Sequence, residues 1–307
     1  MYGRNLMAKF KLKNYLEIMR PVNCVMGRFT VFIGLLISHP EQNFQSFIQN
    51  SVNIFLIIAG FLIFFLVAGE TNAINDYYDY EIDKINRPNR PIPRGDITLK
   101  QSLQFYVFLN SVALILAMII GFITVNGILI PLIVLFFQFI GYLYAWKAKA
   151  SGLPGNIIVG VTSAVGFPFA ALFINTFQEI PSLIWAIYIA TSIFQTSREF
   201  VKGMQDIEGD QQFNIKTIAN LYGYKIATIF MVTFSSIGAI LFTLMIYFYE
   251  LNIFYIIFII IADIIVVTAN ILLISNPVDP KKQKISSLFI KIAGAILILA
   301  FLFGYFL

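Results

Sequence analysis

Long apolar runs separated by short polar segments recur along almost the whole chain. Each run is long enough to cross a bilayer as an α-helix, which needs about 20 residues. We place nine spans at about 16–38, 52–76, 99–123, 127–146, 155–176, 182–203, 225–249, 252–275 and 286–307. The pattern predicts an all-α membrane protein whose residues 1–307 form a single polytopic domain.

The composition agrees with a protein that is solvated mainly by lipid. Of the 307 residues, 59% are hydrophobic and 12% are charged, whereas a soluble domain has about twice that charged share. The single cysteine, Cys24, and the single histidine, His39, exclude an internal disulfide and a metal site built from Cys or His. Any chemistry must therefore come from carboxylates, amides and bases.

The basic residues all fall on one predicted face of the membrane. The 21 Lys and Arg residues occur in five places, at 4–28, 84–100, 147–149, 198–225 and 281–291. By the positive-inside rule this face is cytoplasmic, with the N-terminus inside and the C-terminus outside. Some of these bases suit anionic membrane lipids. The net charge of +5 thus reflects an excess of basic residues on one side of a cell membrane. We therefore expect no nucleic-acid partner.

Two carboxylate clusters lie on the same basic face. Asn75, Asp79 and Asp83 follow the second span at a spacing of four residues, and Asp206 and Asp210 repeat that spacing after the sixth span. On a continuous helix such residues share one face, where like charges repel unless a cation or several bases sit opposite. Oxygen ligands without His or Cys suit Mg²⁺, which also binds phosphate oxygens of a substrate. The clusters predict a Mg²⁺ site between two cytoplasmic loops at about 77–98 and 204–224.

A phosphate-bearing ligand would explain the bases that accompany these acids. Four aspartates, Mg²⁺ ions and a diphosphate together leave negative charge that bases must balance. The candidates to bind the diphosphate are Arg87, Arg90, Arg94, Lys149, Lys202 and Lys216. An EF-hand is excluded, because the loop has no Gly at the required position.

The motifs resemble those of the UbiA superfamily of intramembrane prenyltransferases. Its Asn-x-x-x-Asp-x-x-x-Asp motif matches residues 75–83, its Asp-x-x-x-Asp motif matches residues 206–210, and the run 87–95 resembles its Asn-Arg-Pro loop. Its Tyr-x-x-x-x-Lys motif fits Tyr144 and Lys149, although Tyr142 and Lys147 have the same spacing. One departure is Asn214, where many relatives have Gly.

This resemblance implies a fold and an activity. The fold would place about nine spans around a central cavity, with the two cytoplasmic loops helical and capping it. The activity would be Mg²⁺-dependent transfer of an isoprenyl group from its diphosphate to an acceptor. The resemblance assigns catalytic roles to Asp79, Asp83, Asp206, Asp210, Lys149 and Tyr144. It also assigns Asn75 to the metal and the substrate.

The acceptor is less determined by the sequence. Arg20, Asn23 and Arg28 lie in the first span, where an anionic acceptor would suit the two cations. A phosphate and an aromatic carboxylate satisfy this demand equally.

The run Arg198–Lys202 resembles the subgroup that makes archaeal ether lipids. In that subgroup a geranylgeranyl group passes from geranylgeranyl diphosphate to the hydroxyl of geranylgeranylglyceryl phosphate. We expect this lipid phosphate as the acceptor, with Arg198 and Lys202 on its phosphate. Glu199 would pair with one of these bases, and a catalytic role for it is the alternative.

Two rival functions and two further acids complete the predictions. An aromatic quinone precursor as acceptor is the alternative within the fold. A membrane transporter is the alternative from another class, but it would place its ionisable residues near the bilayer midplane. Glu70, one turn before Asn75, could support the first motif, whereas we expect Asp263 to be buried against a polar neighbour on another helix. Donor chain length and oligomeric state do not follow from the sequence.

Overall fold

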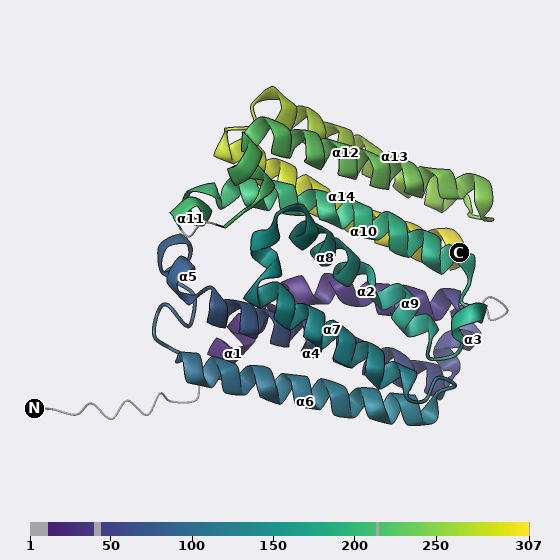
Figure 1. Ribbon diagram of the computed structural model, residues 1–307. Helices are drawn as coiled ribbons and strands as arrows, with labels where there is room; N and C mark the ends of the chain where they lie inside the picture. Colours follow the sequence, from purple (N-terminus) through teal and green to yellow (C-terminus); the bar gives the residue numbers. More distant parts are fainter. Residues whose placement is uncertain (1–11, 40–43, 213–214, 307) are drawn as a thin grey trace, which may run out of the picture.

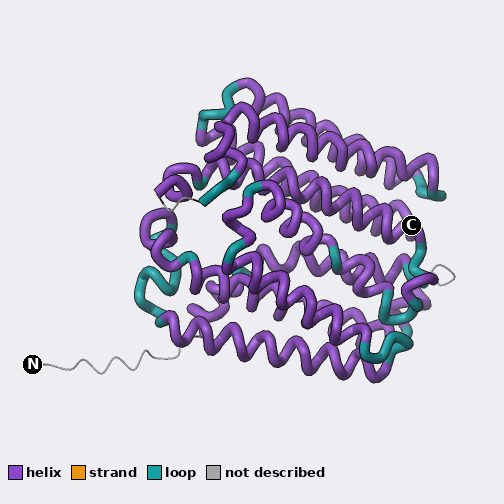
Figure 2. Tube along the Cα trace, in the orientation of Figure 1, coloured by secondary structure: helices purple, strands orange, loops and turns teal. Residues whose placement is uncertain are grey.

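The structure, a computed structural model, describes residues 12–39, 44–212 and 215–306, without the side chains of 22–28 and 306. Its α-helices are α1 (Leu12–Met19), α2 (Pro21–Ile37), α3 (Phe44–Gln49), α4 (Ser51–Tyr78), α5 (Tyr80–Asn86), α6 (Leu99–Ile123), α7 (Leu129–Trp146), α8 (Leu153–Ala164), α9 (Gly166–Ala171), α10 (Ser182–Gln205), α11 (Ile207–Gln212), α12 (Ile218–Phe248), α13 (Ile253–Ser275) and α14 (Pro280–Phe306). Short 3₁₀ turns cover Ala148–Ser151 and Phe177–Glu179. The described residues contain no strand (Figure 2), so the prediction of an all-α fold is confirmed.

Seven helical segments of the described chain are long and apolar enough to cross a membrane. They are α4, α6, α7, the α8–α9 pair, α12, α13 and α14. The first and sixth predicted spans correspond to α1–α2 and to α10, which are not among the seven. The exact count of nine spans therefore stays a prediction.

Two of the predicted spans are broken helices. The first is interrupted at Arg20, whose φ of 53° and ψ of 60° place it in the left-handed region between α1 and α2. Pro21 follows directly, and a residue before proline is disfavoured in the right-handed helical conformation. The fifth span is divided between α8 and α9 at Val165. Neither of these two spans is therefore a single uninterrupted helix.

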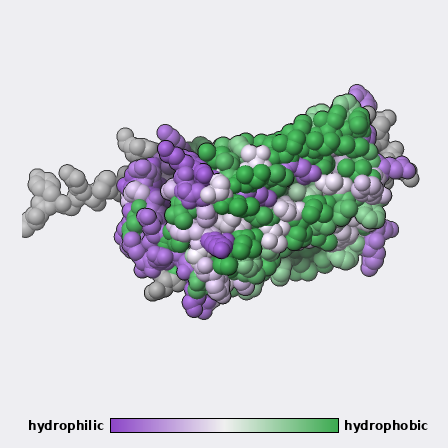
Figure 3. Space-filling model, turned by 90° about the horizontal axis from the view of Figure 1, so that it is seen from above, coloured by the Kyte–Doolittle hydropathy of each residue, from purple (hydrophilic) through white to green (hydrophobic). Residues whose placement is uncertain are grey.

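The long helices lie side by side and form two groups (Figure 1). In one group α4 packs against α6 and α7, and in the other α10 packs against α8, α12 and α14. The short helices α5 and α11 lie at one end of the bundle and contact each other, whereas α14 ends at the opposite end. Polar residues gather at the end that carries α5 and α11, and apolar residues cover much of the visible flank (Figure 3).

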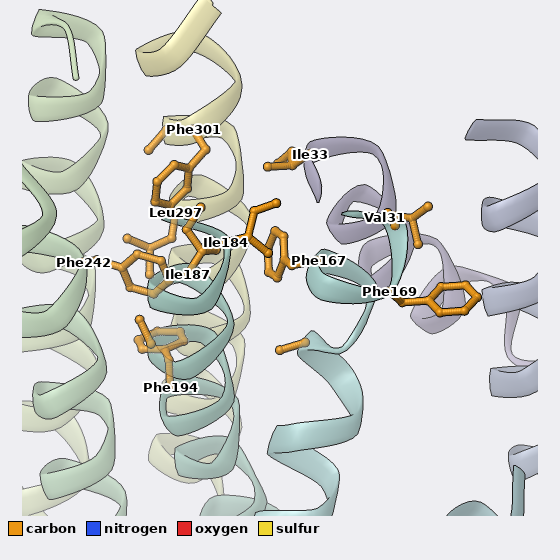
Figure 4. Close-up of a cluster of buried hydrophobic side chains, with 14 of the residues drawn as sticks. Val31, Ile33, Phe167, Phe169, Ile184, Ile187, Phe194, Phe242, Leu297 and Phe301 are labelled. Atoms are coloured by element: carbon orange, nitrogen blue, oxygen red, sulfur yellow. The ribbon is translucent and has the colours of Figure 1, made fainter. Parts of the chain in front are cut away.

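A continuous apolar core joins the two groups of helices. Side chains of α2 and α9 meet those of α10, α12 and α14, as Phe167, Phe194 and Phe301 illustrate (Figure 4). Close approach of α2 and α9 requires a small residue, because a Cβ on Gly34 would lie 2.4 Å from the Phe167 carbonyl oxygen. Helices in lipid associate through such close packing. This contact fixes one wall of the central cavity.

Candidate active site

Each aspartate motif begins where a long helix passes into a short cap helix. Asp79 joins α4 to α5 with φ −83° and ψ 3°, and Asp206 joins α10 to α11 with φ −98° and ψ 6°. Backbone hydrogen bonds of the i to i−4 type continue through both junctions, from Asp79 N to Asn75 O at 2.9 Å and from Asp210 N to Asp206 O at 2.9 Å. The motif side chains therefore keep their helical spacing, as predicted, although the helix axis is interrupted.

Two buried isoleucines hold the loop between α5 and α6 in place and thereby position its arginines. Ile92 and Ile97 are 4% and 2% exposed and pack with Ile18 and Ala73 in a small apolar cluster. Burial of these side chains holds the loop against α1 and α4. Arg87 and Arg90 then line the cavity, whereas the Arg94 side chain lies outside it.

A cavity of about 540 Å³ lies between the two groups of helices. Its apolar lining consists of Ile63, Phe64, Val67, Ala68, Ile133, Val134, Phe137, Ile140, Ile158, Val159, Val165 and Phe169. Asn75 lies at its polar end, twelve positions after Ile63 on α4, a distance of about 18 Å along a helix axis. The cavity thus suits a ligand with a charged head and a long apolar tail.

Six basic side chains of the described chain line this cavity: Arg20, Arg87, Arg90, Lys149, Arg198 and Lys202. Five of them pair with carboxylates. Arg87 contacts Asp206 at 3.0 Å, and Lys149 contacts Asp79 at 2.5 Å. Arg87 therefore ties the end of α5 to the second motif.

The pairs of Arg20 and Arg90 form a buried network around Asp76. Arg20 and Arg90 both contact this carboxylate, and Arg90 also contacts Asp83. Asp76 is 3% exposed and was not among the predicted site residues. Its position one residue after Asn75 was visible in the sequence, but its two arginine partners come from a helix break and a loop whose folding the sequence pattern does not reveal.

The described polar atoms at this end suit a hard metal ion. The Oδ1 atom of Asn75 is buried without a hydrogen-bond partner, and a buried oxygen of this kind requires a partner. Asp206 and Asp210 line the same cavity. Burial, reinforced by the neighbouring Asp206, raises the pKa of Asp210 to about 6. No group of three or more His, Cys, Asp or Glu side chains in the described residues is close enough together to hold a metal unaided.

A second polar region lies two turns earlier on α10. Arg198, Glu199 and Lys202 line the cavity there, and Lys202 contacts Glu199 Oε1. The predicted pairing of Glu199 with a neighbouring base is confirmed. Arg198 makes no ion pair in the described part of the chain, and its Nε atom is buried without a hydrogen-bond partner.

The structure distinguishes the two Tyr-Lys pairs that fit the Tyr-x-x-x-x-Lys motif. Tyr144 and Lys149 line the cavity. Tyr142 instead hydrogen-bonds the hydroxyl of Tyr78 at 3.1 Å, and Lys147 lies over the Trp146 ring at 4.1 Å from its centroid.

Several predicted residues are not brought to the cavity. Arg94 is exposed and pairs with Glu17 at 3.1 Å and Asp96 at 2.7 Å, and Lys216 is exposed beside Thr217, which does line the cavity. The side chains of Asn23 and Arg28 and the whole of Asn214 lie outside the described residues.

The two intramembrane acids have structural partners. Glu70 is fully buried and accepts hydrogen bonds from Asn110 at 3.4 Å and Gln138 at 3.1 Å. It joins α4 to α6 and α7 and does not line the cavity, so its support of the first motif stays a prediction. Asp263 accepts a hydrogen bond from the Thr243 hydroxyl at 3.0 Å, which confirms its predicted polar neighbour.

Polar residues that the sequence reasoning missed also line the cavity. They include Asn72, Thr162, Ser163 and Asn156. Asn156 follows Gly155 shortly after the Tyr-Lys motif, so that motif gave a signal for it. The others lie on helix faces that only the packing of α4 and α8 identifies.

The fold and the cavity define an α-helical membrane protein that binds an amphiphilic, anionic ligand at one end of its bundle. The chain belongs to the UbiA prenyltransferase family, whose model matches residues 29–305. It is therefore an integral membrane protein, and the transporter hypothesis is wrong.

Similarity to known proteins covers nearly the whole chain. The digeranylgeranylglyceryl phosphate synthase of Methanosphaera stadtmanae is 35% identical over 290 residues, which cover 94% of this chain and 98% of the relative. A solved structure of a digeranylgeranylglyceryl phosphate synthase is 30% identical, with a TM-score of 0.71 and coverage of 96% of this chain and 98% of the other. A UbiA homolog from Archaeoglobus fulgidus, bound to GPP and Mg²⁺, shares the fold at 20% identity, with a TM-score of 0.67 over 94% of this chain and 98% of the other.

Proposed function

We propose that the protein transfers a geranylgeranyl group from geranylgeranyl diphosphate to the hydroxyl of geranylgeranylglyceryl phosphate and releases diphosphate, a step of ether-lipid synthesis. The observation that carries this proposal is one cavity in which Asn75 of the first motif and Asp206 and Asp210 of the second meet a long apolar lining. Similarity to full-length synthases that make this product supports the choice of substrates.

The donor head would lie among the bases of the two motifs. Arg87, Arg90 and Lys149 line this end of the cavity and are held by Asp206, Asp83 and Asp79. These bases would stabilise the negative charge that develops on the leaving diphosphate. The apolar lining along α4, α7 and α8 would hold the prenyl tail and exclude water from the reactive carbon.

Divalent metal would complete this charge balance. The basic residues that line the cavity are matched by Asp76, Asp79, Asp83, Asp206, Asp210 and Glu199, so a diphosphate and a second phosphate arrive at a site with little net charge. Asn75, Asp79, Asp83, Asp206 and Asp210 supply the oxygen ligands that Mg²⁺ prefers. When bound, Mg²⁺ neutralises and orients the diphosphate oxygens.

The acceptor phosphate would lie beside Arg198 and Lys202. Arg198 has a buried Nε without a partner and no carboxylate among the described residues, so a phosphate would satisfy it. Arg20, at the break before α2, lines the same cavity. Lys84 in α5 and Lys216, which lies between α11 and α12, are at the same end of the bundle, and such a bias of bases supports a cytoplasmic orientation of this site.

An assay with two acceptors tests the proposed function. The purified protein receives radiolabelled geranylgeranyl diphosphate, Mg²⁺, and either geranylgeranylglyceryl phosphate or 4-hydroxybenzoate. We expect labelled ether product only from the lipid phosphate, and none when EDTA is added. Product from the aromatic acceptor alone would contradict the proposed acceptor while retaining prenyl transfer.

A further inference from the structure

Glu199 is the cavity carboxylate that the two aspartate motifs do not include. In the described chain three carboxylates line the cavity, and the other two, Asp206 and Asp210, belong to the second motif. The Glu199 side chain is 11% exposed and is therefore largely removed from water. Burial of a carboxylate costs free energy, and the proposed metal site, which does not include Glu199, does not explain why an acid lies here.

The contacts of Glu199 leave one carboxylate oxygen available. Lys202 contacts Oε1, and Oε2 has no hydrogen-bond partner in the described part of the chain. Glu199 can therefore accept a proton at Oε2 without first breaking its ion pair.

The position of Glu199 between two bases matches the acceptor chemistry. Arg198 precedes it directly and Lys202 lies one turn later, and both line the cavity. In geranylgeranylglyceryl phosphate the free hydroxyl is on the carbon next to the one that carries the phosphate. A phosphate bound by Arg198 and Lys202 would bring this hydroxyl within reach of Glu199.

We propose that Glu199 is the general base of the transfer, an inference that rests on the proposed function above. The acceptor oxygen forms a bond to the first carbon of the geranylgeranyl group, whose bond to the diphosphate oxygen breaks. The electron pair of that bond leaves with the diphosphate. The hydroxyl proton passes to Oε2 of Glu199, which later releases it to solvent.

The neighbouring acids are less suited to this task. Asp79 is held by Lys149 at 2.5 Å, and Asp206 by Arg87 at 3.0 Å, and both belong to the set proposed for the metal. Glu199 lies seven residues before Asp206, about 10 Å along the helix axis. That separation places the base at the acceptor and the aspartates at the donor head.

Three variants test the proposal. Glu199→Gln removes the base and keeps the shape, and Glu199→Asp keeps a shorter base. Glu81→Gln is the matched control, because Glu81 is also paired with a lysine three residues later, Lys84 at 2.9 Å, but is exposed. The readouts are ether formation at saturating lipid acceptor, the KM for that acceptor, and the affinity for geranylgeranyl diphosphate with Mg²⁺.

The expected result is a loss in the transfer step alone. Glu199→Gln should lower kcat about 10²-fold or more, the usual contribution of a general base, with donor affinity unchanged within about threefold. Glu199→Asp should recover about tenfold of that loss, and Glu81→Gln should behave as the wild type.

Other results overturn the proposal in distinguishable ways. If Glu199→Gln keeps more than about a third of kcat, the departing diphosphate takes the proton instead. If only the acceptor KM changes, or if donor affinity is lost, Glu199 serves to balance Lys202 or to shape the cavity. If the wild type forms no ether from the lipid phosphate, the proposed function itself fails and the inference fails with it.

Discussion

The two aspartate motifs share a backbone design but differ in their surroundings. Each places an aspartate at the junction of a long helix with a short cap helix. Asp79 and Asp83 are 4% and 2% exposed and are held by bases. The Asp206 side chain is 34% exposed, and its partner Arg87 comes from the end of α5, four residues after the first motif. Asp210 is also buried, at 6% exposed, so the two motifs differ at Asp206, the most open of the four aspartates.

This difference indicates how the site can accept a substrate. The bases that hold Asp79, Asp83 and Asp206 are the same bases proposed to contact the diphosphate. With Asp79, Asp83 and Asp206 holding a metal ion, these bases would face the phosphate oxygens, so that no buried charge would be left without a partner. Asp206, the most exposed of these carboxylates, would be the first of them that a metal ion and its diphosphate reach.

Removal of the first aspartate of either motif, Asp79 or Asp206, should have the largest effect on turnover. Asp79→Ala and Asp206→Ala should each lower turnover about 10³-fold or more, because the metal ligand and the partner of a base are lost together. Turnover is measured with saturating substrates, and thermal unfolding checks that the protein remains folded. Undiminished activity of a folded variant would contradict the metal site.

Substitution of Arg90 and substitution of Arg94, both in the α5–α6 loop, should have very different effects on turnover. Arg90→Ala should lower turnover about 10²-fold, because Arg90 lines the cavity and contacts both Asp76 and Asp83. Arg94→Ala should remain within about threefold of the wild type, because its partners Glu17 and Asp96 lie at an exposed site. Equal losses in the two variants would show that the loop acts as a unit and not through Arg90.

The contact between the two caps should have a smaller effect. A Cβ on Gly209 would lie 2.1 Å from the Asn86 side-chain amide, so Gly209→Ala must displace α11 or the Asn86 side chain. We expect turnover to fall about tenfold. Asn86→Ala in the same chain should restore most of it by making room. If Asn86→Ala does not restore turnover, Gly209→Ala acts by disturbing the α11 backbone and not through the Asn86 side chain.

The sequence predicted the regular helices well because a helix that crosses a bilayer must have a certain length and an apolar composition. The span expected at 99–123 coincides with α6, and the span at 252–275 differs from α13 by one residue. The motif spacing was likewise sufficient to place Asn75, Asp206, Asp210, Tyr144 and Lys149 around one cavity.

What the sequence did not predict depends on contacts between distant segments. Asp76 has a role only because Arg20, 56 residues earlier, reaches it from a helix break. Pro21 gave a signal for that break, whereas nothing local distinguishes Arg94 from Arg90. Their separation follows from the burial of Ile92 and Ile97, which turns one arginine inward and the other outward.

The central claim is that both motifs hold the head of one prenyl diphosphate through metal. The most direct test measures geranylgeranyl diphosphate affinity with and without Mg²⁺ in the wild type, Asp79→Asn and Asp206→Asn. We expect Mg²⁺ to tighten wild-type binding about tenfold or more, and each variant to lose that gain. Affinity that Mg²⁺ does not change, or a gain that survives in either variant, would contradict the account.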